Sequence, residues 1–159
     1  MNKYLKFLLA VCILSVFGCK DEEATPSKTR TELLTLSPWK MTAATYDPGV
    51  DLGGTIVTDI YAQVFEDCDK DDTQKYNTNG TLVYDEGENK CDPSLPQTGT
   101  SSWRFNTDET KIIIDSDDEL TFDIEAITSS ELQISQIYDG DEIGGNPLLK
   151  YKLTFTYSH

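Results

Sequence analysis

Histidine and basic residues are scarce in this chain of 159 residues. The single histidine is His159, and 13 Lys and Arg stand against 28 Asp and Glu, which gives a formal net charge of −15. Nucleic-acid binding depends on Lys and Arg that neutralise phosphates, and a peripheral grip on anionic lipid needs clusters of the same residues. The composition therefore excludes a nucleic-acid partner and a polybasic membrane contact. It also leaves no internal histidine for acid–base catalysis.

Motifs that activate a nucleophile or cradle a phosphate are also missing. The serines lack a Gly-x-Ser-x-Gly setting, and the pairs Gly53-Gly54 and Gly144-Gly145 lack the spacing of a phosphate-binding loop. Asp123 and Glu125 alternate with apolar residues on one predicted strand, so they should point to water, where nothing prepares a carboxyl for general acid catalysis. The sequence predicts no catalytic residues, no cofactor and no enzymatic activity.

The densest acidic run surrounds a cysteine. Asp67, Asp69 and Asp71 alternate like the opening of an EF-hand loop, in which successive carboxylates converge on Ca²⁺. The sixth position of that loop needs glycine and is Asp72, and the twelfth needs glutamate and is Thr78. The EF-hand interpretation therefore fails, and we expect a solvated loop and no metal site. An irregular calcium site built from these carboxylates stays open as an alternative.

Long hydrophobic runs are absent except near the start of the chain. The run Phe7–Phe17 holds 11 apolar or small residues and follows Lys3 and Lys6. Such a helix would span about 16 Å, roughly half the hydrocarbon thickness of a membrane. A short apolar run after a positive start is typical of a signal peptide, which we assign to residues 1–18.

The end of this run resembles the lipobox of bacterial lipoproteins. Val16-Phe17-Gly18-Cys19 has an aliphatic residue, then a small residue directly before the cysteine, although Phe17 is larger than usual at its position. The resemblance implies that Cys19 carries acyl chains such as palmitate, which anchor the protein to the outer membrane. Lys20-Asp21-Glu22-Glu23 is similar to the export signal of surface-displayed lipoproteins, and surface and periplasmic locations both stay open. Residues 19–31 are expected to form a flexible linker.

The four cysteines divide by position. Cys12 falls in the predicted signal peptide and Cys19 in the lipobox, which leaves Cys68 and Cys91 as an even pair in an exported chain. A bridge between them would close a 24-residue segment and contribute about 3 kcal/mol. Metal ligation would need further ligands that histidine or another cysteine pair would supply. Counting therefore favours a disulfide over a metal site or a reactive thiol.

From about Glu32 onward, polar and apolar residues alternate with a period of two, which predicts strands. Asn79-Gly80 lies between two such runs and predicts a tight hairpin. Residues 48–66 break the pattern, and their second half could be a short helix or an extended loop. The eight predicted strands are residues 39–43, 74–77, 81–85, 102–105, 111–115, 120–126, 132–134 and 149–157.

Each predicted strand has one apolar face, and no crossover helix separates consecutive strands after residue 72. A single antiparallel sheet in a small domain hides such a face by closing on itself. We therefore predict an all-β fold over residues 32–159, an antiparallel up-and-down barrel of about eight strands. The predicted inward residues are Trp39, Met41, Leu82, Tyr84, Trp103, Phe105, Ile112, Ile114, Phe122, Ile124, Leu132, Ile134, Tyr151, Leu153 and Phe155.

Several segments together resemble the lipocalin-like domain of small bacterial lipoproteins. They are Leu36–Lys40, Asp67–Asp72, Tyr76–Thr81, Asp85–Gly87, Cys91–Pro93 and Gly99–Trp103, followed by the last strand. The resemblance implies a lipocalin-like barrel, a Cys68–Cys91 pair and a Trp39 that closes the barrel base. Ser37-Pro38 replaces the glycine usual before that tryptophan. It implies an apolar cavity but names no ligand.

The aromatic residues are the remaining candidates for a binding site. Our hypothesis is that some of them line a cup for a small apolar ligand, whereas the competing interpretation is that they fill the barrel. The sequence thus predicts a membrane-anchored, non-enzymatic ligand-binding protein. The alternative is a surface interaction or structural module with a solid core and no small-molecule ligand. The candidate ligand contacts are Trp39, Tyr84, Trp103, Phe122, Tyr151 and Phe155.

The lipobox prediction can be tested by fractionation. A Cys19→Ser variant cannot accept acyl chains, so it should leave the membrane fraction and appear among soluble proteins. The measurement is immunodetection of both forms after membranes are sedimented. A variant that sediments with membranes as the parent does would refute the anchor.

Overall fold

The computed structural model describes residues 27–159 except Leu52 and Asp117. The predicted signal peptide, Cys19 and the first part of the predicted linker lie outside the described residues. The first element begins at Arg30, two residues before the expected start of the domain. No helix within the described part of the chain has the length and hydropathy needed to cross a membrane.

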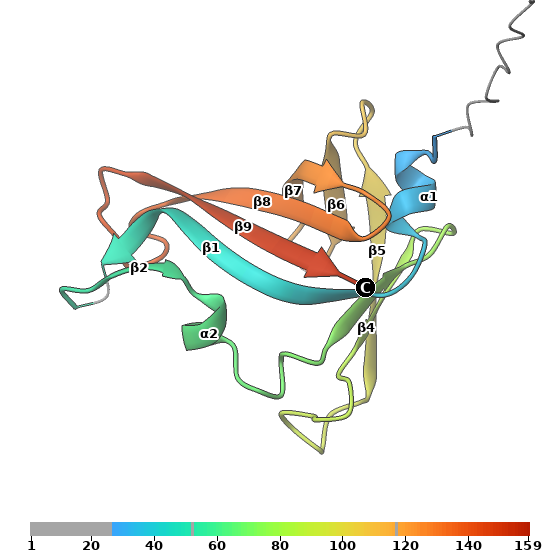
Figure 1. The fold of residues 1–159 in the computed structure, drawn as a ribbon, viewed down its shortest axis with the longest axis horizontal. Helices are drawn as coiled ribbons and strands as arrows, with labels where there is room; N and C mark the ends of the chain where they lie inside the picture. Colours follow the sequence, from blue (N-terminus) through green and yellow to red (C-terminus); the bar gives the residue numbers. More distant parts are fainter. Residues whose placement is uncertain (1–26, 52, 117) are drawn as a thin grey trace, which may run out of the picture.

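The described chain folds as an antiparallel sheet that closes on itself, with two short helices (Figure 1). Around the ring the order is β1-β3-β4-β5-β6-β7-β8-β9, and β9 pairs again with β1, so the predicted eight-stranded up-and-down barrel is confirmed. The ninth strand, β2, pairs only with the far part of β1. In chain order the elements are α1 (Arg30–Leu34), β1 (Trp39–Asp51), β2 (Ile56–Asp59), α2 (Tyr61–Val64), β3 (Thr73–Tyr76), β4 (Thr81–Asp85), β5 (Thr98–Phe105), β6 (Lys111–Asp115), β7 (Leu120–Ile127), β8 (Glu131–Asp139) and β9 (Lys150–Ser158).

Strand β1 closes the barrel because it pairs along both of its edges. Its first residues pair with β3, where Trp39 faces Gln74. Its other edge pairs with β9 over most of its length, from Lys40 opposite Ser158 to Asp47 opposite Lys152. The alternation visible in the sequence covers only residues 39–43, whereas the observed strand has 13 residues, because its second half is held by β9 and β2.

The tight hairpin between β3 and β4 forms as predicted. The Asn77 amide donates to the Thr81 carbonyl, and Gly80 has a φ of 83°, which favours glycine over other residues. The Trp103 amide donates to the Gly80 carbonyl and ties this turn to β5. Local turn chemistry therefore sets the register of two ring strands.

The outward faces of the strands carry ion pairs, as their alternation predicts. Asp123 pairs with Lys111 of the neighbouring strand at 2.5 Å, and Glu125 pairs with Lys152 at 2.6 Å. The Ser135 hydroxyl also donates to Glu125, and the Lys152 ammonium and this hydroxyl hold the pKa of Glu125 below its ordinary value. These carboxylates are engaged in surface contacts across strands.

One end of the barrel is closed by a packed base. Leu34 of α1 and Trp39 at the start of β1 are fully buried there, and the Trp39 indole Nε1 donates to the Leu34 carbonyl at 2.8 Å. This contact explains how α1 is held against the base. The buried residues around them are Tyr76, Leu82, Trp103, Ile112, Ile114, Leu132, Ile134 and Tyr157.

Helix α1, strand β2 and part of the core were not predicted, whereas a short helix was one of the two forms left open for the second half of residues 48–66. Helix α1 follows a capping box in which Thr29 and Glu32 bond reciprocally, a spacing readable in the sequence. Within residues 48–66 the chain forms β2 and then α2, and a second core cluster joins Ala44, Val57, Ile60 and Leu153 beneath them. The four residues of β2 are too few to show a clear alternation of polar and apolar residues. The strand is stabilised by its pairing with β1.

Packing at the base should dominate stability. Leu82→Ala removes a fully buried side chain and should lower the free energy of unfolding by about 3 kcal/mol, since a cavity remains. Val83→Ala, on the opposite face of the same strand, is the matched control and should cost about 1 kcal/mol or less. Urea unfolding followed by tryptophan fluorescence measures both. Equal losses for the two variants would contradict this placement of the core.

Candidate functional site

A cavity of about 300 Å³ lies inside the barrel and borders the packed base, since Ile114, Ile134 and Tyr157 belong to both. Seven of the eight ring strands contribute to its wall, and only Gln74 among its lining residues is not apolar or aromatic. Its volume falls at the lower end of the range for small-molecule sites. The lining residues are Met41, Phe65, Gln74, Tyr84, Ile114, Leu120, Phe122, Ile134, Phe155 and Tyr157.

A second cavity of about 220 Å³ adjoins the first. The two share five lining residues, so we call them the inner cavity and the mouth of one site. The shared residues are Met41, Phe65, Gln74, Tyr84 and Tyr157. The mouth differs in chemistry, because four of its lining residues are acidic, namely Asp69, Asp72, Asp85 and Glu86.

The wall of the mouth is built by two loops that are fixed to each other. The Cys68–Cys91 disulfide predicted from counting is present and joins them. One oxygen of Asp71, Oδ2, also accepts hydrogen bonds from the amides of Glu88 and Asn89, at 2.7 and 3.0 Å. Phe65 enters the cavity from the segment just before this bridge, so the bridge restrains a wall of the site.

Glycine is required where these loops meet. Gly87 has a φ of 67°, and a Cβ at this position would lie 2.5 Å from the carboxylate oxygen Oδ2 of Asp71. Backbone conformation and close approach therefore both favour glycine there. The Asp71 carboxylate can accept the two amides because no side chain stands between the loops.

Asp72 carries the largest electrostatic strain in the mouth. Burial raises its pKa to about 6, and repulsion from Glu86, Asp69, Asp71 and Asp85 acts in the same direction. Its oxygen Oδ1 is inaccessible to solvent and accepts no hydrogen bond from the described residues. In Asp71, burial also raises the pKa, but the amides of Asn89 and Glu88 outweigh it and hold the pKa below its ordinary value. Asp72 has no such compensation.

Two tyrosines inside the site are kept neutral. Burial raises the pKa of the Tyr84 hydroxyl, and it raises that of Tyr157 much further although a hydrogen bond with Gln74 opposes the shift. A neutral phenol can donate as well as accept a hydrogen bond. The inner cavity thus offers Tyr84, Tyr157 and Gln74 as polar groups on an otherwise apolar wall.

Four of the six aromatic residues predicted as ligand contacts line the site. Tyr84, Phe122 and Phe155 face the inner cavity, and Tyr84 and Trp39 face the mouth. The rings of Phe122 and Phe155 meet edge to face, 6.1 Å apart. Some of the aromatic residues therefore line a hollow and others fill the barrel, whereas the ligand itself stays a prediction.

Trp103 and Tyr151 line neither cavity. Trp103 belongs to the base, where its ring meets Tyr76 edge to face and its Nε1 donates to the Asn77 carbonyl at 3.0 Å. The Tyr151 hydroxyl accepts from the Asn146 amide, so the ring supports the hairpin between β8 and β9. Inward alternation alone could not distinguish these places, since it gives the face of a strand and not the level along the barrel axis.

Sequence reasoning missed the residues that give the mouth its character. Tyr157 continues the predicted inward series of Tyr151, Leu153 and Phe155 by one step, whereas no inward residue was predicted on the strand that holds Gln74. Phe65 lies in the segment for which no strand was predicted. Asp72 was grouped with a solvated loop, because the carboxylates of Asp85 and Glu86, which help to raise its pKa, are distant in the sequence.

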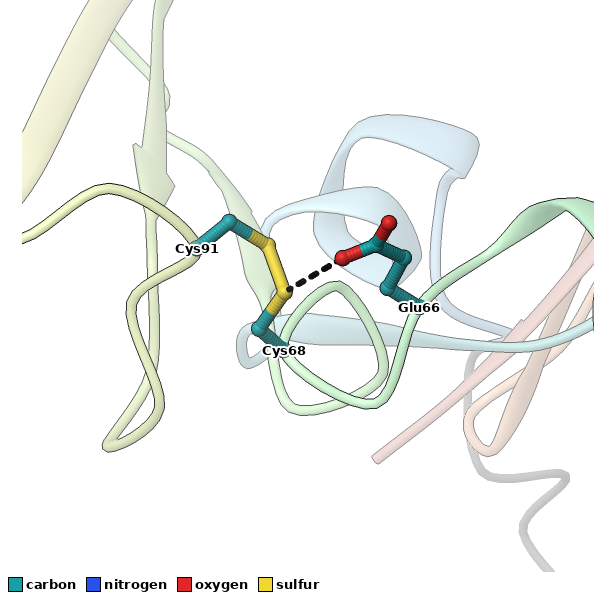
Figure 2. A group of neighbouring side chains, drawn as sticks. All are labelled: Glu66, Cys68 and Cys91. Atoms are coloured by element: carbon teal, nitrogen blue, oxygen red, sulfur yellow. Dashed lines mark hydrogen bonds between the residues drawn. A yellow bond between two sulfur atoms is a disulfide. The ribbon is translucent and has the colours of Figure 1, made fainter.

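The predicted acidic loop does not gather its carboxylates around one point. Among the described residues, Glu66, Cys68 and Cys91 form the only group of three potential metal ligands whose donor atoms lie within 4.8 Å of one another (Figure 2). Both sulfurs of that group are bonded to each other, and Glu66 Oε2 lies 3.8 Å from Cys68 Sγ. A disulfide sulfur is not a thiolate, so this group offers a metal a single carboxylate.

Comparison with known proteins gives no family assignment. No family model matches the chain, and no curated protein matches it. Among solved structures, the chain is similar to bovine odorant-binding protein in complex with a selenium-containing odorant, with 14% identity and a TM-score of 0.43 over 86% of this chain and 76% of that one. The complex of the same bovine protein with undecanal gives 12% identity and a TM-score of 0.41, over 86% and 76% of the two chains. The pairing of β9 with β1 closes the barrel independently of these similarities.

Asp72 should lower stability at neutral pH. Its pKa is near 6 in the folded protein and near 3.8 as a free side chain, so the folded state must ionise a disfavoured carboxyl as pH rises. Asp72→Asn should therefore stabilise the protein by about 1 kcal/mol at about pH 7.5, a value reduced for screening by solvent. Below about pH 4 the gain should vanish, because the carboxyl is then protonated in both states.

Thermal denaturation at both pH values is the measurement. Asp141→Asn removes the same charge from an exposed position in the β8–β9 hairpin and is the matched control. We expect Asp72→Asn to raise Tm by roughly 4 °C at neutral pH and Asp141→Asn to leave it nearly unchanged. A lower Tm for Asp72→Asn at neutral pH would show that its carboxylate is stabilised instead.

Proposed function

We propose that this protein is a non-enzymatic, membrane-anchored lipoprotein with a lipocalin-like barrel that holds a small apolar ligand. The observation that carries the proposal is the inner cavity of about 300 Å³, with its almost entirely apolar wall. Clefts of this kind, with a few placed polar groups, are the usual form of small-molecule sites. Tyr84, Tyr157 and Gln74 would orient the ligand.

The closed base supports a container rather than a channel. Leu34 and Leu82 are fully buried there and line neither cavity, so a ligand would enter and leave through the mouth. The disulfide between Cys68 and Cys91 would hold the mouth in shape. Rigid walls favour binding, because the protein then loses little conformational freedom when the ligand enters.

The anchor and the location are part of the same proposal. They rest on the lipobox-like segment that ends at Cys19 and on the apolar run before it. The lipid would attach at Cys19 and place the barrel at the outer membrane, on the periplasmic side or on the cell surface. The absence of an internal histidine and of nucleophile motifs in the sequence supports binding without catalysis.

A neutral fluorescent probe tests the binding site. N-phenyl-1-naphthylamine brightens in apolar surroundings and should bind the soluble domain saturably, with about one site per chain. Leu120→Trp adds bulk at a partly exposed position of the inner cavity and should weaken binding about fivefold or more. Leu95→Trp, exposed on the loop between β4 and β5, is the matched control and should bind as the parent does.

If the soluble domain does not bind the probe, a protein-interaction function is favoured instead. Side chains of Ile137, Leu148 and Leu149 are 51%, 90% and 44% exposed near the hairpin between β8 and β9, an arrangement that would suit a protein contact. Absence of saturable probe binding, with both variants folded by thermal denaturation, would refute the ligand proposal. The protein would then be better described as a surface interaction or structural module.

A further inference from the structure

We infer that the ligand is an amphiphile whose apolar body fills the inner cavity and whose positively charged, ammonium-type head lies at the mouth beside Asp72. The inference rests on the proposed function and adds the chemistry of the ligand. It starts from the continuity of the two cavities, which share Met41, Phe65 and three further residues. One molecule can therefore contact the apolar wall and the acidic mouth together.

The charge of the mouth is of one sign. Its lining includes Asp69, Asp72, Asp85 and Glu86, whereas no described residue lining either cavity is Lys, Arg or His. The nearby Lys70 ammonium is paired with the Asp67 carboxylate at 2.8 Å and does not offset the repulsion that acts on Asp72. A carboxylate head would meet repulsion here, and a cationic head would relieve it.

Asp72 differs from two of its acidic neighbours at the mouth, whose carboxylates already accept hydrogen bonds. One oxygen of Asp85, Oδ1, accepts from the Gly87 amide and from Gln97 Nε2, and one oxygen of Asp69, Oδ2, accepts from the Glu66 amide. The oxygen Oδ1 of Asp72 is shielded from solvent and has no hydrogen-bond donor among the described residues. An ammonium head at the mouth would offset the negative charge that the neighbouring carboxylates place around Asp72.

The geometry favours a cation that carries an apolar body over a small metal ion. Phe65, Tyr84 and Tyr157 line both cavities, so a head at Asp72 would continue directly into an apolar body. The aromatic faces would also attract a cation. Among the described residues, the carboxylates of the mouth do not form a cluster with donor atoms within 4.8 Å, which a small metal ion would need.

Displacement of N-phenyl-1-naphthylamine by three ten-carbon-chain compounds tests the inference with the same body and different heads. The compounds are decylammonium, decanol and decanoate, used at about pH 7.5, where Asp72 is ionised. Decylammonium should bind about tenfold more tightly than decanol, and decanoate should bind more weakly than decanol. Added salt should reduce the advantage of decylammonium over decanol.

Asp72→Asn should reduce the ratio of decylammonium to decanol affinity about fivefold, and Asp141→Asn should leave that ratio unchanged. Equal affinities of decylammonium and decanol for the parent protein would overturn the cationic head and keep the apolar site. No displacement by any compound, with no saturable probe binding, would instead refute the proposed function. Saturable binding of Ca²⁺ alone that Asp72→Asn abolishes, without preference for decylammonium, would overturn the inference and assign the mouth to a metal.

Discussion

Closure of the sheet through β1 is the constraint on which the rest of the structure depends. This strand pairs with β3 at its start and with β9 along most of its other edge, so the ring has no free edge there. Closure converts the apolar face of every strand into an interior. It also brings together residues from both ends of the chain, such as Met41 and Tyr157, which are paired across the seam. The cavity exists because this interior is not completely filled.

The two ends of the interior have different contents. At the base, large side chains such as Trp39, Tyr76 and Leu82 fill the space, and α1 covers it. Elsewhere in the barrel, Phe122 and Phe155 line the inner cavity together with Phe65, which precedes the disulfide. Hydrophobic burial stabilises the first end, whereas the second exposes apolar wall that a ligand could cover. The two regions meet at Ile114, Ile134 and Tyr157, which belong to the packed core and also line the inner cavity.

The mouth holds several carboxylates that repel one another, and a cationic ligand would relieve this repulsion. Asp71 is compensated by backbone amides across the loops, whereas Asp72, one residue later, is partly buried among other carboxylates. Strain of this kind lowers stability and is common at functional sites. The disulfide and the Asp71 contacts hold the two loops together against this repulsion.

The sequence alone determined the elements whose causes are local. Alternation with a period of two specified most ring strands and their inward faces, Asn79-Gly80 specified one hairpin, and an even pair of cysteines specified the bridge. Only the tertiary structure decided the length of β1, the existence of β2 and the level at which each aromatic residue lies. These three features depend on pairing and packing between residues far apart in the chain, which a local sequence pattern does not report. The same reason explains why Phe122 lines a cavity while Trp103 fills the base, and why Asp72 differs from its acidic neighbours.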